Sequence, residues 1–173
     1  MLKKTVGLFI LIAVLAVPVV GQTDADKGMN VSAGMFFVTD GDASDVMGNG
    51  IGVTLDKKVR STASMDLHAS VGYYKFSGDY LGYDVDASII PLMVTGIYGK
   101  NADKATKTYY GLGVGLTMFD ANLEGYDLGN ETDFAYQLLG GVEFGKNMFA
   151  EAKYLSGGRN GNTGFGVNVG MKF

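Results

Sequence analysis

Residues 164–173 read Gly-Phe-Gly-Val-Asn-Val-Gly-Met-Lys-Phe, and the two parities of this stretch differ in character. One parity is apolar throughout, whereas the other is polar or has no side chain. Successive side chains of a β-strand point to opposite faces, so the stretch predicts a strand with one apolar face. Its last residue is a large aromatic, which is wasteful in water and well placed at a membrane interface. The apolar parity comprises Phe165, Val167, Val169, Met171 and Phe173.

The amino terminus has the features of an export signal. Two lysines precede an apolar run from Val6 to Val17, which Pro18 ends. A basic start, an apolar stretch of about 7–15 residues and a small-residue exit are typical of a cleavable secretory signal peptide. The run is shorter than the roughly 20 residues that a transmembrane helix needs. We therefore expect a signal peptide over residues 1–21 and a single mature domain over residues 22–173.

The mature chain repeats the alternating pattern of the last ten residues. Its 27 glycines, 2 prolines and absence of cysteine suit strands and turns better than packed helices or a disulfide framework. No later stretch could span a bilayer as a helix, so a membrane form must be a closed sheet. The second of eight expected strands looks short and should borrow residues from its flanks. The expected strands are Met29–Thr39, Ile51–Asp56, Ser64–Phe76, Asp84–Gly99, Tyr110–Met118, Phe134–Phe144, Met148–Leu155 and Gly164–Phe173.

Segments rich in Gly, Asp, Asn, Ser and Lys separate these strands and predict turns or loops. The fourth strand is the least regular, because apolar residues occupy both of its parities: Val85, Ala87, Ile89, Met93 and Ile97 on one, Ile90, Leu92 and Val94 on the other. Pro91 within it cannot donate a ladder hydrogen bond, which predicts a bulge or a local break. The expected connections are Asp40–Gly50, a basic turn at Lys57–Thr62, Ser77–Tyr83, a long acidic loop at Asp120–Thr132 and a tight turn at Gly145–Asn147.

The alternation of apolar and polar residues alone fits two kinds of barrel, which turn their apolar faces in opposite directions. A soluble lipocalin-like barrel turns its apolar face inward, whereas a membrane barrel turns it outward. Gly111, Gly113 and Gly115 would leave a soluble barrel with a nearly bare outer surface. An eight-stranded barrel has little interior space, so small residues suit its inner face. We therefore predict an all-β fold, an eight-stranded antiparallel up-and-down transmembrane β-barrel.

The charged residues favour the same choice, because they segregate between the two expected rims. The rim with the longer loops is acidic, as in Asp79 and Asp120, whereas the other rim carries lysines such as Lys57 and Lys146. Longer loops lie on the external side of outer-membrane barrels. Loops that are charged only for solubility would have no reason to segregate by sign.

The polar parity also predicts a cluster inside the barrel. Catalysis needs an acid, base or nucleophile held by an orienting neighbour. Glu143 and Glu151 could form a glycosidase pair, but ion pairing with Lys153 is the ordinary interpretation in a narrow barrel. The single histidine, His68, fits a packed interior group better than a catalyst. The predicted structural cluster is Asp66, His68, Gln137, Glu143, Glu151 and Lys153.

Other kinds of site find little support. Asp40–Asp45 lacks the sixth-position glycine and the distal glutamate of a calcium loop, and no helix follows Gly111–Gly115 to make a phosphate cradle. With 18 acidic against 14 basic residues, the chain is a poor candidate for nucleic-acid binding. We expect no catalytic residue, metal or cofactor.

The signal peptide, the hairpin spacing and the terminal Phe173 together resemble the small outer-membrane β-barrel domain family of OmpA-type, opacity-protein-like and "porin family" barrels. The resemblance implies a cell outer membrane of the Gram-negative type, with membrane lipid and lipopolysaccharide as surroundings. It also implies that the barrel assembly machinery reads the closing strand. We expect a monomer with a structural or cell-surface interaction role through acidic external loops and an unknown extracellular ligand. The alternatives are a narrow porin-like channel for small solutes and, third, an outer-membrane enzyme.

Overall fold

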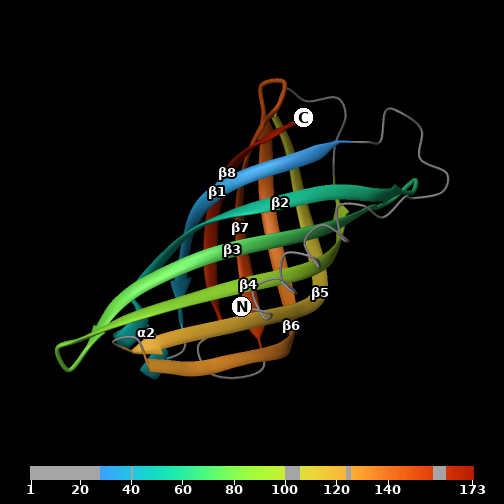
Figure 1. Ribbon diagram of the computed structural model, residues 1–173. Helices are drawn as coiled ribbons and strands as arrows, with labels where there is room; N and C mark the ends of the chain where they lie inside the picture. Colours follow the sequence, from blue (N-terminus) through green and yellow to red (C-terminus); the bar gives the residue numbers. More distant parts are fainter. Residues whose placement is uncertain (1–27, 40, 100–105, 124–125, 158–162) are drawn as a thin grey trace.

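Eight antiparallel strands close into a barrel in which each strand pairs with its neighbours in sequence and β8 pairs with β1 (Figure 1). The computed structural model describes residues 28–39, 41–99, 106–123, 126–157 and 163–173. The predicted signal peptide, residues 1–21, lies outside them. The up-and-down barrel predicted from the alternation is confirmed. Its elements are β1 (Met29–Val38), α2 (Gly41–Met47), β2 (Asn49–Ser61), β3 (Asp66–Tyr80), β4 (Tyr83–Tyr98), β5 (Thr106–Leu123), β6 (Tyr126–Phe144), β7 (Met148–Gly157) and β8 (Gly164–Lys172).

The closing strand has the two faces that its sequence predicts. Val169 is 61% exposed on the outside of the barrel, whereas its neighbour Asn168 is 1% exposed and points into the lumen. β8 pairs with β1 from Asn30–Lys172 to Val38–Gly164. Backbone hydrogen bonds between Met29 and Phe173, at 3.2 and 2.8 Å, complete this seam.

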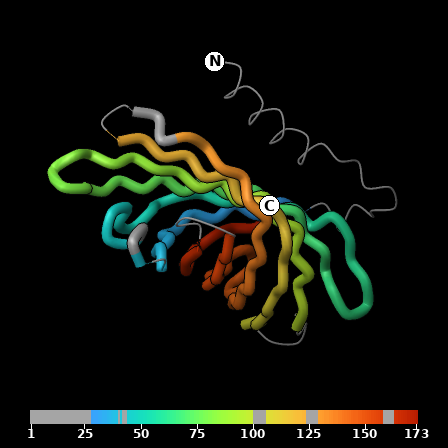
Figure 2. The backbone as a smooth tube through the Cα atoms, turned by 90° about the horizontal axis from the view of Figure 1, so that it is seen from below, coloured from blue at the N-terminus to red at the C-terminus, as the bar shows by residue number. Residues whose placement is uncertain are grey.

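The two ends of the barrel differ. One end holds the start of β1, the end of β8 and the β2–β3 and β6–β7 turns, and we call it the terminal rim. The other holds α2 and the β3–β4 and β5–β6 hairpins, and we call it the loop rim. The β3–β4 hairpin reaches beyond its surroundings in both views (Figure 1 and Figure 2).

The outward face of the barrel carries an apolar band with aromatic residues near both rims. Toward the loop rim, the Tyr154 ring lies 6.4 Å from Tyr136 and 5.0 Å from Phe165. Toward the terminal rim, Tyr98 and Tyr110 stack at 5.7 Å. The exposed apolar side chains between these belts include Met35, Val53, Leu112, Val114, Leu138, Val167 and Val169.

Two predicted loops are wrong, because strands replace them. β3 and β4 continue through most of the predicted Ser77–Tyr83 loop to a two-residue turn at Leu81 and Gly82. β5 and β6 likewise extend through most of the predicted Asp120–Thr132 loop. Polar side chains suggested loops there, but a strand whose outer face meets water tolerates them, and continued pairing satisfies the backbone.

Two other predicted turns are also wrong. Most of the predicted Asp40–Gly50 turn folds into α2, whose Met47 is 4% exposed over the lumen core. Burial of this side chain gives the short helix a tertiary anchor that local turn chemistry does not reveal. The predicted basic turn at Lys57–Thr62 lies mostly within β2, which continues through a register shift between Lys58 and Arg60. The expected extension of this strand into its flanks is confirmed. Within the described part of the chain, no helix is long and apolar enough to cross a membrane.

β4 reverses its polarity along its length, which explains its irregular sequence. Near the loop rim, Val85 and Ile89 are buried inside while Asp86 is exposed outside. Farther along, Val94 is exposed outside and Thr95 is buried. The outward residues also change from polar to apolar on the neighbouring long strands. The changes fall between Lys75 and Tyr73 on β3, Ser88 and Ile90 on β4, Asp120 and Met118 on β5, and Thr132 and Phe134 on β6.

Pro91 interrupts one ladder without shifting it. On the β5 side, pairing runs continuously from Ile90–Met118 through Pro91–Thr117. On the β3 side it stops at Val71–Leu92 and resumes in the same register at Tyr74–Ile89. The predicted local break is therefore confirmed, and the alternative of a bulge is wrong, because a missing donor removes a hydrogen bond without adding a residue.

Candidate functional site

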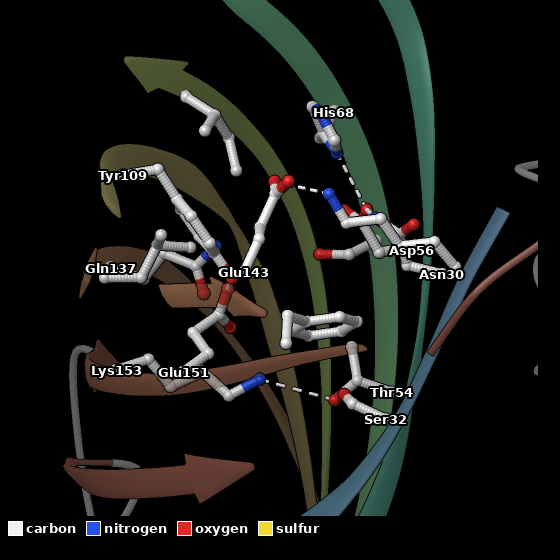
Figure 3. Close-up of a pocket in the computed structure, with 15 residues that line it drawn as sticks. Asn30, Ser32, Thr54, Asp56, His68, Tyr109, Gln137, Glu143, Glu151 and Lys153 are labelled. Carbon is white, nitrogen blue, oxygen red and sulfur yellow. Dashed lines mark hydrogen bonds and ion pairs between the residues drawn. The ribbon is translucent and has the colours of Figure 1, made fainter. Parts of the chain in front are cut away.

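A polar cavity of about 40 Å³ occupies the part of the lumen nearer the terminal rim (Figure 3). Inward-facing residues of β1 to β8 line it, because each strand places alternate side chains in the lumen. Five of the six residues of the predicted cluster meet here: His68, Gln137, Glu143, Glu151 and Lys153. Asp66 does not, because it lies at the start of β3 and accepts a hydrogen bond from the exposed Ser61 at the terminal rim.

Asp56 contacts two other polar side chains on one side of the cavity. Its Oδ1 accepts a hydrogen bond from Asn30 Nδ2 at 2.7 Å and lies 2.7 Å from His68 Nδ1 (Figure 3). His68 is 4% exposed, and its Nε2 has no hydrogen-bond partner among the described residues. A polar cavity of this size suits ordered water, which would satisfy such an atom.

The other carboxylates of the cavity are also partnered. Glu151 Oε2 accepts a hydrogen bond from the Tyr109 hydroxyl at 3.2 Å. Glu143 forms an ion pair with Lys172. The two glutamates therefore belong to different partnerships, and neither is arranged as an acid–base pair around an open site. Such pairing offsets part of the cost of burying charge.

A hydrogen-bonded layer closes the cavity on the side of the loop rim. Lys153 Nζ donates to Thr54 Oγ1 at 3.3 Å, and Thr54 is 3.0 Å from the Tyr74 hydroxyl. Tyr74 in turn donates to Asn168 Oδ1 at 3.3 Å, and Lys153 lies over the Tyr74 ring at 5.5 Å. Residues of four strands thus span the lumen.

Beyond this layer the lumen is filled by an apolar core. Phe36 packs against Tyr74 with ring centroids 5.3 Å apart and against Phe76 at 6.0 Å. α2 covers this core with Met47. The remaining core residues include Val38, Ala87, Ile89, Met93, Ala121, Ala135 and Leu155.

Charged groups of opposite sign lie together around the cavity. Three carboxylates, Asp56, Glu143 and Glu151, alternate with His68 and two lysines around the cavity. Among the described residues, no three His, Cys, Asp or Glu side chains are grouped to hold a metal ion.

Sequence reasoning missed three titratable residues of this cavity. Asp56 and Lys172 look like rim charges in the sequence, and Tyr109 is an aromatic residue at a strand end. The available signal was parity, because Tyr109 shares the inward parity of Gly111 and Gly113, and Lys172 that of Asn168.

The loop rim forms a second candidate site, which is acidic. Asp86 there accepts hydrogen bonds from Lys75 and Ser77, each at 3.1 Å. These contacts, that of Lys75 first, hold the pKa of the Asp86 carboxyl below its ordinary value. The described charged residues of this rim are Asp45, Asp79, Asp84, Asp86, Asp120, Glu131 and Asp133, with Lys75. The terminal rim instead carries Lys57, Lys58, Arg60, Lys107, Lys146 and Lys172, with Asp56, Asp66 and Glu143 in or beside the lumen.

Several solved structures are similar to this chain, including the following three. Neisserial surface protein A is 18% identical, with a TM-score of 0.58 over 84% of this chain and 94% of that one. The N-terminal β-barrel domain of Pseudomonas aeruginosa OprF is 15% identical, with a TM-score of 0.52 over 86% and 98%. Ail, the attachment invasion locus protein of Yersinia pestis, is 15% identical, with a TM-score of 0.53 over 86% and 99%. Neither a protein-family model nor a curated protein sequence matches the chain.

These likenesses bear on architecture. The chain has the fold of small eight-stranded outer-membrane barrels, and it spans nearly the full length of the three similar chains. The resemblance drawn from the signal peptide, the hairpin spacing and the terminal Phe173 is thereby confirmed at the level of the fold.

Proposed function

We propose that this protein is an integral outer-membrane β-barrel with a structural or cell-surface interaction role and no catalytic activity. The observation that carries the proposal is the outward apolar band between two aromatic belts on a closed barrel. Such a surface is costly in water and suits a bilayer. Closure of the barrel also pairs the backbone groups of every strand, so that no strand edge is exposed to lipid.

The interaction role rests on the loop rim. Its β3–β4 and β5–β6 hairpins continue beyond the apolar band as paired strands, and its described charges are nearly all acidic. Long external loops and short periplasmic turns are usual for this architecture, so the loop rim is assigned to the cell exterior. The names of two similar proteins, a surface protein and an attachment invasion locus protein, agree with such a role.

A channel is the less favoured alternative. The layer from Lys153 to Asn168 and the apolar core around Phe36 both fill the lumen. The partners of Glu143 and Glu151 likewise favour a structural network over an enzyme in this cavity.

In cells, we propose that the closing strand is the signal for the barrel assembly machinery. The residues concerned are Phe165, Val167, Val169, Met171 and Phe173, all exposed on the outer face. The finished barrel would lie in outer-membrane lipid and lipopolysaccharide as a monomer.

Fractionation and surface labelling test this proposal. Because the chain has no cysteine, Ser77→Cys and Asn147→Cys place unique thiols near the loop rim and in the β6–β7 turn. We expect both variants in the outer-membrane fraction, with only Cys at position 77 reacting with an impermeant maleimide on intact cells. A mature protein that is soluble without detergent, or labelling only at position 147, would contradict the proposal.

A further inference from the structure

The tip of the β3–β4 hairpin carries an exposed apolar group that nothing in the described protein covers. Leu81 is 81% exposed, and Tyr80 and Tyr83 are each 49% exposed. The hairpin reaches beyond the loops around it (Figure 2). We call Tyr80, Leu81, Gly82 and Tyr83 the hairpin tip. Its exposed side chains lie outside the apolar band, beyond the outward polar residues Lys75 and Ser88.

The tip also contains backbone strain. Leu81 has φ of 56°, and among the described residues other than glycine it alone has positive φ. A two-residue hairpin turn normally places Asn, Asp or Gly there, because a larger side chain is disfavoured in the left-handed region. Leu81 therefore costs stability and makes no packing contact that would offset the cost, which is a pattern found at functional positions.

Charge repulsion adds to this cost. Asp79 and Asp84 are direct cross-strand partners, immediately behind the paired Tyr80 and Tyr83. Like charges directly opposite each other destabilise a hairpin. Asp79 also accepts a hydrogen bond from the Gly82 backbone N–H at 3.1 Å, which fixes the turn. This hydrogen bond thus holds the turn, although the exposed side chains of the tip are unfavourable in water.

Along the hairpin axis these residues form three layers. Leu81 lies at the apex, the two tyrosines lie behind it, and the two aspartates lie behind them. A bilayer surface has matching layers, with hydrocarbon for an aliphatic side chain, an interface for tyrosine and water for charge. At about 3.3 Å per residue, the distance from Leu81 to the Asp layer is within the roughly 5–10 Å depth of interfacial insertion.

We infer that the hairpin tip inserts into a zwitterionic lipid bilayer opposite the protein's own membrane, such as the surface of another cell. This inference rests on the proposed function, which assigns the loop rim to the cell exterior. The hairpin tip protrudes and has an apolar apex, and it needs no preformed pocket when the partner is a fluid bilayer. Asp79 and Asp84 disfavour anionic lipid, including a surface rich in phosphate, and so favour an uncharged one.

The absence of tryptophan from the chain allows a direct test. Leu81→Trp places a single fluorophore at the apex, and Asn147→Trp places one in the β6–β7 turn as the control. The mature protein is held in a tryptophan-free amphipathic polymer and titrated with extruded phosphatidylcholine vesicles. We expect a blue shift and quenching by shallow brominated lipid for Trp at position 81 and neither for position 147. Vesicles with one quarter phosphatidylglycerol should bind more weakly at low salt.

A second pair of variants keeps the test independent of the fluorophore. Leu81→Asn removes the apolar apex and suits the left-handed backbone, so vesicle binding should fall about tenfold or more while the barrel becomes no less stable. Asp79→Asn with Asp84→Asn should remove the discrimination against phosphatidylglycerol.

Three results would overturn the inference. The first is an emission spectrum at position 81 that phosphatidylcholine vesicles leave unchanged. That result would indicate that the tip binds a protein and not a lipid bilayer. The second is equal shifts at positions 81 and 147. The third is a blue shift in dilute proteoliposomes without added vesicles, which would mean that the tip folds back on its own bilayer. The purified-protein assay is independent of cellular orientation, so failure of the proposed function would appear separately in the intact-cell labelling.

Discussion

The Tyr74 hydroxyl donates a hydrogen bond to Asn168 Oδ1 at 3.3 Å, joining β3 to β8 through the interior of the barrel. Both side chains are almost completely buried, although they stand 94 positions apart in the chain. The contact belongs to the layer that separates the polar cavity from the apolar core, so it bears directly on whether the lumen conducts.

Conduction should therefore be small and irregular in planar-bilayer recordings of the pure protein. Tyr74→Ala removes the ring on which Phe36 and Lys153 lie, and should raise the conductance. The same change should lower the free energy of unfolding by about 3–5 kcal/mol, the usual cost of removing a large buried ring. Tyr110→Ala, on the outer face, is the control and should leave conductance unchanged. Large, steady currents from the unmodified protein would instead support a channel.

Charge placed on the two faces of β8 should act through different mechanisms. Val169→Arg puts a charge on the outer face near mid-strand, where lipid exposure costs about 2–4 kcal/mol. Asn168→Arg enters the filled lumen and should act through crowding. Unfolding titrations in the same lipid measure both costs, and a lipid-soluble label should mark position 169. Marking of position 168 in place of 169 would contradict the parity of the strand.

Loss of the terminal ring should affect delivery more than stability. Phe173 is 70% exposed within the protein, and Phe173→Ala keeps its backbone hydrogen bonds with Met29. The ring contributes at most about 1.5–3 kcal/mol of burial, so the refolded barrel should lose little. Delivery to the outer membrane in cells should fall strongly if the closing strand is the assembly signal. Equal losses in both assays would argue against that role.

Two glycines make a matched test of lumen crowding. A Cβ on Gly34 would overlap the backbone oxygen of Val167, so Gly34→Ala should cost about 1–3 kcal/mol. Gly140 faces outward, and the nearest heavy atom to its Cβ position is 3.9 Å away. Gly140→Ala should therefore be neutral or slightly stabilising. Denaturant titrations in lipid compare the two, and similar costs would mean that the inward assignment of Gly34 is wrong.

Acid should loosen the base of the β3–β4 hairpin. Because Lys75 and Ser77 stabilise the ionised Asp86, its pKa lies below the ordinary value of 3.8. A lowered pKa gives stability that is present above the ordinary value and is lost as pH falls through the lowered one. An NMR titration should give a midpoint below 3.8 for Asp86. Lys75→Met should raise that midpoint and Lys75→Arg should not; an unchanged midpoint in Lys75→Met would refute the assigned cause.

The sequence predicted best those strands that keep one polarity along their whole length. β8 alternates without exception from Phe165 to Lys172, so parity alone fixed its two faces. β4 could not be predicted in this way, because Ile89 belongs to a core inside the barrel while Ile90 faces outward. A strand that leaves the bilayer follows the rule for a soluble sheet, with the apolar side in.

The candidate site shows a similar limit. Alternation placed His68, Glu151 and Lys153 in the lumen, because they lie on the polar parity of their strands. It could not show which carboxylate meets which cation, since those pairs depend on barrel register and join distant strands. Whether Asp56 and Lys172 lie at the rim or in the lumen was ambiguous for the same reason. One more pair of residues along a strand separates a rim position from a lumen position.

The change of outward polarity on β3, β4 and β5 falls on residues that are aligned with one another. Lys75 pairs with Ser88 and Ser88 with Asp120, one step outside the apolar band. If the barrel sank by one such step, all of these polar side chains would enter hydrocarbon together, whereas rising by one step would wet Tyr73, Ile90 and Met118. Immersion depth is therefore a cooperative property of these three strands, and it fixes the height of the β3–β4 hairpin above the apolar band.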